Sequence, residues 1–176
     1  MTRKSRSERL AFIVVAAVAG AALAGGSGAL AAKPDRAPYE PGPLELEPGQ
    51  ACEFPVTIET LPGSNYTQTF FSDGREVITG SGRERVTNES NAKSIVLHSG
   101  GTSRFTVDGD NLLIELSGRG SLYFFAGDQG PFGEVGADGA LYSYVGRVEE
   151  VLDLNQDLIT SATLNGRATE LCSLIR

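Results

Sequence analysis

The sequence predicts an all-β domain whose antiparallel strands form a meander that closes into a small β-barrel. From Cys52 onward, short stretches alternate apolar and polar residues and are separated by turns rich in Asp, Asn and Gly. The only two cysteines, Cys52 and Cys172, open the first of these stretches and end the last. A disulfide between them would bring the terminal strands together and close the sheet. A β-sandwich with adjacent terminal strands satisfies the same constraint and is the alternative.

Residues 1–31 have the three parts of a secretory signal peptide. A basic start precedes an uncharged run over 10–23, and an Ala-Leu-Ala triplet ends at Ala31. We therefore expect cleavage near Ala31 or Ala32 and a secreted protein with no stable membrane insertion afterwards. The alternative is an N-terminal membrane anchor with the domain facing outside, because the uncharged run extends to Ala32 and could span a bilayer.

Residues 32–51 are predicted to be a Pro-rich linker. Five of the eight prolines fall within this stretch, and acidic residues and glycines fill the gaps between them. Such a composition favours extended, solvated chain. The expected organisation is therefore a signal peptide over 1–31, this linker, and an antiparallel β domain over 52–176.

Cys52 and Cys172 are predicted to pair. Export places both thiols in an oxidising compartment, where a disulfide is the usual outcome. Two cysteines and one histidine, His98, are too few for a zinc site. The bond would close a loop of roughly 120 residues, for which the chain-entropy model gives on the order of 4–5 kcal/mol of stabilisation.

The domain is predicted to contain a series of short strands. They cover 53–60, 67–71, 76–79, 83–87, 94–98, 103–107, 112–116, 122–126, 141–145, 147–152, 159–164 and 168–172. Asp-Gly at Gly74 and Gly109 predicts hairpin turns, since glycine accepts the positive φ that they require. The glycines at 118 and 120 and the Asn-Gly ending at Gly166 are interpreted as further turns, and Gly146 as a bulge or bend. Short turns imply that successive strands pair.

Two segments depart from this pattern. Residues 127–140 form a long Gly-rich loop with no periodicity. Residues 148–158 are also open to a short helix, because their apolar residues do not alternate cleanly.

The charge of the chain excludes one class of partner. The precursor has a formal net charge of −7, and removal of four basic residues and one acidic residue with the signal peptide would leave −10. An acidic protein repels phosphate backbones, so no nucleic-acid partner is expected.

No residue is assigned a catalytic, cofactor-binding or metal-binding role, and no cofactor is expected. His98 is the only histidine, and neither a G-x-S-x-G elbow nor a phosphate-binding loop is present. Residues 153–157 begin like a calcium loop but lack its glycine and its closing glutamate, so we interpret them as a polar turn.

Five aromatic residues are candidates for the lining of a ligand pocket. Tyr123 and Phe125 share one face of a strand, and Tyr142 and Tyr144 share a face of another. Phe132 lies in the loop between them. Barrels hold small apolar ligands in mouths covered by such loops. Filling of the core is the alternative role of the five rings.

Three motifs of the predicted domain carry a resemblance. They are the Cys-Glu-Phe-Pro-Val that opens at Cys52, the Asp-Gly hairpin at 72–75, and the Gly-Arg at 166–167 that leads to Cys172 and Leu174. In this layout the chain resembles a group of uncharacterised exported actinobacterial β-domain proteins over residues 52–174. The resemblance implies secretion, a β-fold and the disulfide. The group has no known activity, so it implies nothing catalytic.

Three function classes are consistent with the sequence. The first is a non-enzymatic extracellular or envelope domain that binds a small apolar ligand or a surface partner such as a cell-envelope component. The second is a structural or interaction protein without a pocket. The third is an isomerase or cyclase that resembles allene-oxide-cyclase-like or dirigent barrels. A cavity lined by tyrosine and a buried acid or arginine favours the third class, an apolar cavity the first, and a filled interior the second.

Overall fold

The structure is a computed structural model that describes residues 33–176, so the predicted signal peptide over 1–31 lies outside the described residues. Strands dominate this part of the chain, which confirms the predicted all-β fold class. In chain order the elements are β1 (Asp35–Tyr39), β2 (Leu44–Leu46), β3 (Val56–Thr60), β4 (Asn65–Phe70), β5 (Glu76–Asn88), β6 (Ser94–Asp108), β7 (Asn111–Phe124), β8 (Gln129–Gly130), β9 (Gly133–Glu134), β10 (Ala140–Asp153), β11 (Leu158–Glu170) and α2 (Cys172–Ile175).

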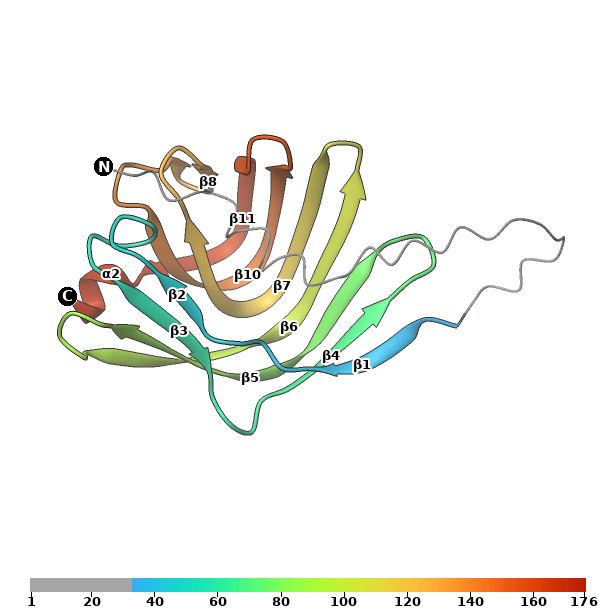
Figure 1. Cartoon of the computed structure of the whole chain (residues 1–176), viewed down its shortest axis with the longest axis horizontal. Coiled ribbons are helices and arrows are strands. Elements are labelled where there is room, and N and C mark those ends of the chain that lie inside the picture. The colour runs from blue at the N-terminus through green and yellow to red at the C-terminus, as the bar shows by residue number, and fades with distance from the viewer. Residues whose placement is uncertain (1–32) are drawn as a thin grey trace, which may run out of the picture.

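The long strands pair antiparallel with their neighbours along the chain (Figure 1). The order across the main, nine-stranded sheet is β1-β4-β5-β6-β7-β10-β11. One half of β5 pairs with β4, and its other half pairs with β3, which in turn carries β2. The hairpin turns predicted at Gly74 and Gly109 are confirmed, and both glycines have positive φ.

The predicted disulfide is confirmed, but the sheet does not close into a barrel. Among the described strands, β1 and β11 are the two ends of the sheet order. The Cα atoms of Cys52 and Cys172 lie 5.7 Å apart. Cys52 precedes β3 and Cys172 begins α2, so the bond joins the two ends of the domain without pairing β3 with β11. A Cα separation of this size requires only that the residues are neighbours, not that their strands share hydrogen bonds.

The segment predicted as a solvated linker contributes two strands to the sheet. β1 pairs with β4 from Asp35 opposite Phe70 to Tyr39 opposite Tyr66, and β2 pairs with β3. Pro38 lies within β1, where an edge strand tolerates proline because only one side of the strand needs its N–H groups. Pro38 therefore belongs to an edge strand, while the other four prolines of the segment lie outside β1 and β2.

Five glycines lie opposite one another across neighbouring strands, and we call them the glycine row. The register pairs Gly80 with Gly101, Gly101 with Gly118, Gly118 with Gly146, and Gly146 with Gly166. Each has φ between 124° and 156°, and a Cβ on any of them would overlap a backbone carbonyl of the adjacent strand. The turns predicted at Gly118 and Gly166 are therefore wrong, because each strand runs on through its glycine. Both β7 and β11 are curved along their length (Figure 1).

Beyond the glycine row, β6 and β7 separate. Their pairing stops where Gly100 lies opposite Arg119. Residues 94–99 of β6 stay with β5, while residues 120–124 of β7 stay with β10. The sheet thus divides into two portions that face each other across a core.

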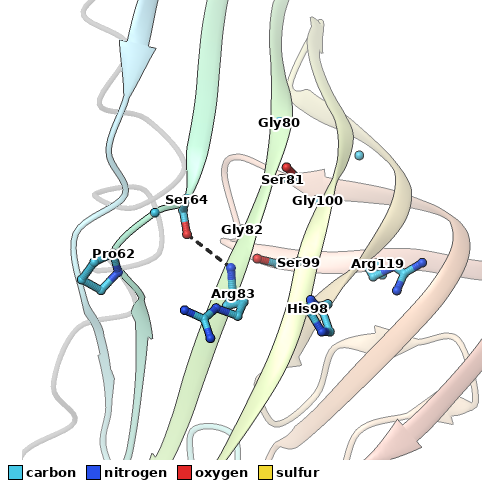
Figure 2. A pocket seen from close by; sticks show the side chains of 12 residues that line it. Pro62, Ser64, Gly80, Ser81, Gly82, Arg83, His98, Ser99, Gly100 and Arg119 are labelled. Atoms are coloured by element: carbon cyan, nitrogen blue, oxygen red, sulfur yellow. Dashed lines mark hydrogen bonds between the residues drawn. The ribbon is translucent and has the colours of Figure 1, made fainter.

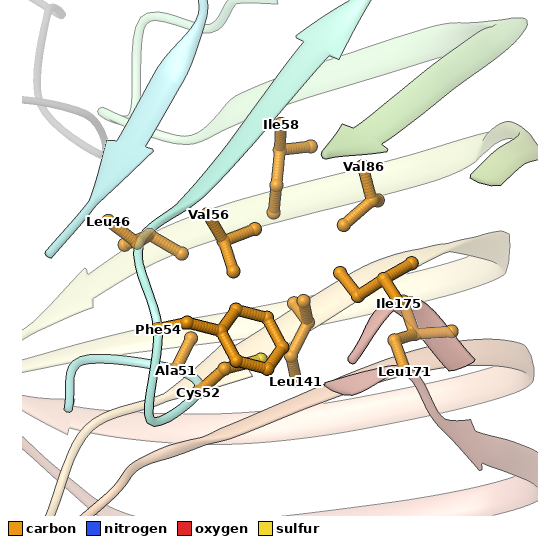
Figure 3. Packing of buried hydrophobic residues seen from close by; sticks show 10 residues of the cluster. All are labelled: Leu46, Ala51, Cys52, Phe54, Val56, Ile58, Val86, Leu141, Leu171 and Ile175. Atoms are coloured by element: carbon orange, nitrogen blue, oxygen red, sulfur yellow. The ribbon is translucent and has the colours of Figure 1, made fainter. Parts of the chain in front are cut away.

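Two hydrophobic cores result from this division. The first lies between the two portions beside the disulfide (Figure 3), and its buried residues are Leu46, Ala51, Cys52, Phe54, Val56, Ile58, Val86, Leu141, Leu171 and Ile175. The second is formed mainly by β7, β10 and β11, and its buried residues are Leu112, Ile114, Leu122, Phe124, Val135, Tyr144, Val148, Leu152 and Ile159. β7 contributes residues from both sides of its bend to the second core, so the bend is what brings its two halves together.

The Gly-rich segment 127–140 is held in place by one buried carboxylate. Asp128 is fully buried and accepts hydrogen bonds from the backbone N–H groups of Phe125 (2.7 Å) and Ile159 (3.0 Å). The segment forms the small β8–β9 hairpin. Residues 148–158 hold the end of β10 and a turn, rather than the helix that was the alternative. Within the described part of the chain, no helix has the length and apolar character to cross a bilayer.

Candidate ligand site

A cavity of about 320 Å³ lies where β6 and β7 separate. We call it the junction cavity, because β3, β5, β6, β7 and β10 all contribute to its wall. Its side chains with chemical function include Tyr66, Glu84, Ser99, Ser121, Tyr123 and Tyr144. The cavity follows from the fold, since the part of β7 beyond Arg119 has no β6 partner and the gap between the two strands is left open.

One of these tyrosines packs against a glycine next to the bend. Gly120 lies opposite Tyr144 in the β7–β10 ladder. A Cβ on Gly120 would lie 3.5 Å from the ring of Tyr144. The ring therefore lies close over the glycine and is buried, with 7% of its surface exposed. A distance of 3.5 Å is an ordinary van der Waals contact, so Tyr144 packs against β7 and forms part of the cavity wall whether or not residue 120 carries a Cβ.

Hydrogen bonds organise the polar part of the lining. The hydroxyls of Tyr66 and Ser99 are hydrogen-bonded at 2.6 Å and link β4 to β6. The hydroxyl of Ser121 donates to Oε2 of Glu84 at 2.8 Å and links β7 to β5. Of these two bonds, only the Ser121–Glu84 bond crosses the region where β6 and β7 part and so joins the two walls of the cavity, whereas the Tyr66–Ser99 bond stays on the β4–β6 side.

The electrostatics of the cavity keep its phenols protonated. Burial, followed by the negative charges of Glu84 and Glu150, raises the pKa of Tyr144 to about 12. Burial is also the main cause that raises the pKa of Tyr66, and Glu84 adds to it, while the hydrogen bond with Ser99 opposes it. At neutral pH these hydroxyls are therefore hydrogen-bond donors or acceptors without charge, beside carboxylates that can only accept when ionised.

A pH dependence of stability follows from Tyr144. In the unfolded chain its phenol loses its proton near pH 10, whereas in the folded protein it keeps the proton to about pH 12. Its contribution is therefore complete below about pH 10 and is lost as the pH rises to about 12, by about 2–3 kcal/mol. Urea unfolding across this interval should show a steeper loss for the wild type than for Tyr144→Phe. Equal losses in the two proteins would contradict the assignment.

A smaller cavity of about 170 Å³ adjoins the first. Phe105, Leu116, Ser121 and Tyr123 line both cavities. The smaller cavity adds Glu150, a carboxylate on β10 with 8% of its surface exposed. The site therefore combines apolar walls with two carboxylates, Glu84 in the junction cavity and Glu150 in the smaller one, and with the guanidinium of Arg119 in the junction cavity.

The structure brings together two of the five aromatic residues singled out from the sequence. Tyr123 and Tyr144 line the junction cavity. Phe125 packs near Tyr123 in the first core, with ring centroids 5.8 Å apart. Phe132 and Tyr142 are in contact at 5.3 Å and line a separate cleft of about 160 Å³ beside the β8–β9 hairpin.

Several residues of the site were not predicted from the sequence. Tyr66, Glu84, Ser121 and Glu150 come from four different strands, and their distances along the chain carry no motif. Glu84 and Glu150 fall on inward-facing positions of alternating strands, where a polar residue is unusual. That interruption of the apolar pattern is the signal that could have indicated them.

No known protein family, curated protein or solved structure matches this chain. The resemblance to exported actinobacterial β-domain proteins therefore stays a prediction. The function has to be argued from the geometry and chemistry of the site itself.

Proposed function

We propose that the protein is a secreted, non-enzymatic extracellular or envelope domain that binds a small ligand in the junction cavity. The observation that carries the proposal is a cavity of about 320 Å³ in which apolar walls surround hydrogen-bonding groups held by the fold. Small-molecule sites combine these two features, and their volumes begin at roughly 300 Å³. Unlike in a barrel, the cavity arises from the separation of β6 and β7.

The polar lining narrows the chemistry of the ligand. Glu84 and Glu150 present acceptors, and Tyr144 presents a neutral hydroxyl. A purely apolar ligand would take these polar groups out of water without offering them a hydrogen bond, which costs binding free energy. The ligand we propose is therefore a small, partly apolar molecule that carries a hydroxyl or an amine.

Three probes of similar size test this ligand class. Benzyl alcohol and benzylamine each offer donors, whereas toluene offers none. We expect the first two to bind about tenfold tighter than toluene, because a site built for hydrogen bonds rejects a partner without them. Titrations followed by nuclear magnetic resonance give the dissociation constants and show which residues respond. In Glu84→Gln, benzylamine should lose more affinity than benzyl alcohol, because the variant removes a negative charge.

Glu45→Gln is the matched control for Glu84→Gln. Glu45 is exposed on β2, so its substitution changes the net charge equally without touching the cavity. It should leave all three affinities unchanged. Equal binding of the three probes, or resonance shifts confined to residues outside the cavity, would contradict the proposed function.

An isomerase or cyclase is the second candidate, and the lining of the site is of the kind that favours this class, because it combines tyrosines with the buried acid Glu150. Ligand binding is proposed first because an isomerase must also bind its substrate. Tyr144 lies within electrostatic range of two carboxylates, Glu84 and Glu150, and a phenol beside carboxylates can move protons on a bound molecule. An isomerase changes the structure of its substrate without changing its mass. Incubation with a small-molecule extract of the producing cells would then shift one compound in chromatographic retention at constant mass, and Tyr144→Phe would abolish the shift.

Export is the remaining part of the proposal. It rests on the signal-peptide pattern over 1–31 and is compatible with the Cys52–Cys172 disulfide, a bond that persists in oxidising compartments. N-terminal sequencing of protein from the culture medium should find a start near Ala32 or Lys33. Full-length chain found only in membranes would support the anchor instead.

A further inference from the structure

A second concavity, of about 510 Å³, lies beside the glycine row (Figure 2). It adjoins the junction cavity, since Ser99, Gly100, Gly101 and Arg119 line both, but within the described part of the chain it has no carboxylate in its lining. We call it the cationic groove. Its lining comes from the β3–β4 loop, β5, β6 and β7, and it contains the guanidinium groups of Arg83 and Arg119 with the imidazole of His98. Adjacent residues of a strand point to opposite faces, so Arg83 points outward while Glu84 points into the junction cavity.

The three basic side chains come from neighbouring strands. Arg83 on β5 lies directly opposite His98 on β6, and Arg119 on β7 lies opposite Gly100, two residues along β6 from His98. Figure 2 shows His98 between the two arginines, with the guanidinium groups directed apart rather than at one point. The arrangement fits a ligand with several charged groups better than a single compact ion.

No carboxylate lines this groove, although the chain contains 22 acidic residues. Within residues 33–176, neither Arg83 nor Arg119 has an ion-pair partner. Other arginines do, as in Arg85–Glu59 and Arg147–Glu115. Like charges placed near each other repel, and an acidic protein that keeps two arginines, both unpaired within residues 33–176, on either side of a histidine leaves them available to an anion.

The floor of the cationic groove allows a ligand to approach the backbone closely. Gly80, Gly82, Gly100 and Gly101 contribute backbone without side chains. Their identity is required by the packing of the strands, because a Cβ on Gly100 or Gly101 would press on the backbone of the neighbouring strand. The glycine row thus bends the sheet and also leaves the groove unfilled.

We infer that the cationic groove binds a ligand that carries two or more oxyanion groups, either phosphates or carboxylates. Arg83 and Arg119 contact separate anionic groups through their guanidinium N–H donors, and His98 lies between them. This inference goes beyond the proposed function, because it needs no ligand in the junction cavity.

Calorimetric titration of the protein with three probes tests the inference. Tripolyphosphate represents a phosphate source, citrate represents a carboxylate source, and inorganic phosphate offers a single anionic group. We expect tripolyphosphate or citrate to bind about tenfold or more tighter than inorganic phosphate, and the tighter of the two identifies the source. The affinity should fall as salt is added, because the arginines are exposed and their charges are screened.

Substitutions inside and outside the groove distinguish a specific anion site from a general effect of the protein's charge on binding. Arg83→Gln with Arg119→Gln should weaken the tighter probe by about tenfold or more, whereas Arg104→Gln should change it by less than about twofold. Arg104 is also exposed on β6 but lies outside the groove. Unchanged circular dichroism verifies that the variants fold. Equal losses in the two variants, or no binding of tripolyphosphate and citrate, would overturn the inference, and Tyr144→Phe should leave anion binding intact.

Discussion

Replacement of Gly101 by alanine is expected to lower the free energy of unfolding by about 3–5 kcal/mol. Gly101 has φ of 135°, which an alanine adopts only with strain. Its Cβ would also overlap the carbonyl oxygen of Ser117 and lie 2.9 Å from the Cα of Gly118. Both obstacles are backbone atoms of β7, so no side-chain rotation relieves the contact. Urea unfolding of the purified variant measures the loss.

Alanine substitutions at two other glycines distinguish backbone strain from steric overlap as causes of this loss. Gly109 has φ of 61° but open space around its Cβ position, so Gly109→Ala should cost only about 1 kcal/mol from backbone strain. Gly136 has neither a positive φ nor a neighbour within 4 Å, so Gly136→Ala should change stability by less than about 0.5 kcal/mol. If Gly101→Ala costs no more stability than Gly109→Ala, overlap with the neighbouring strand is not the cause of the loss.

Removal of the disulfide is expected to have the second-largest effect. The bond joins residues 120 positions apart, so it restricts nearly the whole unfolded domain. The variant with Cys52→Ser and Cys172→Ser should keep its β-sheet circular dichroism spectrum. It should lose about 2–4 kcal/mol of stability, which corresponds to a fall of roughly 8–20 °C in Tm.

Reduced wild-type protein is the control for the cysteine variant. Cys52 is buried in the first core, so its substitution by serine also places a hydroxyl among apolar side chains. Reduction removes the cross-link and keeps both residues. The shift in Tm common to the two samples is the effect of the bond. Free thiols in protein purified without reductant would contradict the pairing.

The sequence predicted the strands better than it predicted their lengths. Alternation located the apolar positions of β3, and Asp-Gly located the turns at Gly74 and Gly109. Each strand from β5 to β7, and also β10 and β11, was predicted as two short strands. Glycine in the middle of a bent strand has the same local signature as glycine in a turn, because both need positive φ.

One signal in the sequence could have distinguished a glycine in a bent strand from a glycine in a turn. Once the turn around Gly109 fixes the β6–β7 register, Gly101 falls opposite Gly118. A glycine opposite a glycine in successive hairpins indicates that neighbouring strands bend together, whereas turn glycines have no cross-strand partner. Without that register, the sequence gives no reason to expect β6 and β7 to separate.

The site was less predictable than the fold because it too depends on where β6 and β7 separate. The junction cavity exists because β6 and β7 diverge beyond Arg119, and the closed barrel predicted from the disulfide contains no such divergence. Tyr123 and Tyr144 were identified because aromatic residues stand out in a strand. Glu84 and Tyr66 reach the same cavity only through the pairing of β5 with β4 and β6, which is a property of the whole sheet.

Native mass spectrometry of the protein purified from the cells that produce it tests the central claim, a ligand in the junction cavity, most directly. The account predicts a second species, heavier than the protein alone by the mass of one small molecule. The double variant Glu84→Gln with Tyr144→Phe should lose this species, while Glu45→Gln should retain it. Wild-type protein found only at its unliganded mass, or a bound molecule retained equally by the cavity variant, would contradict the account.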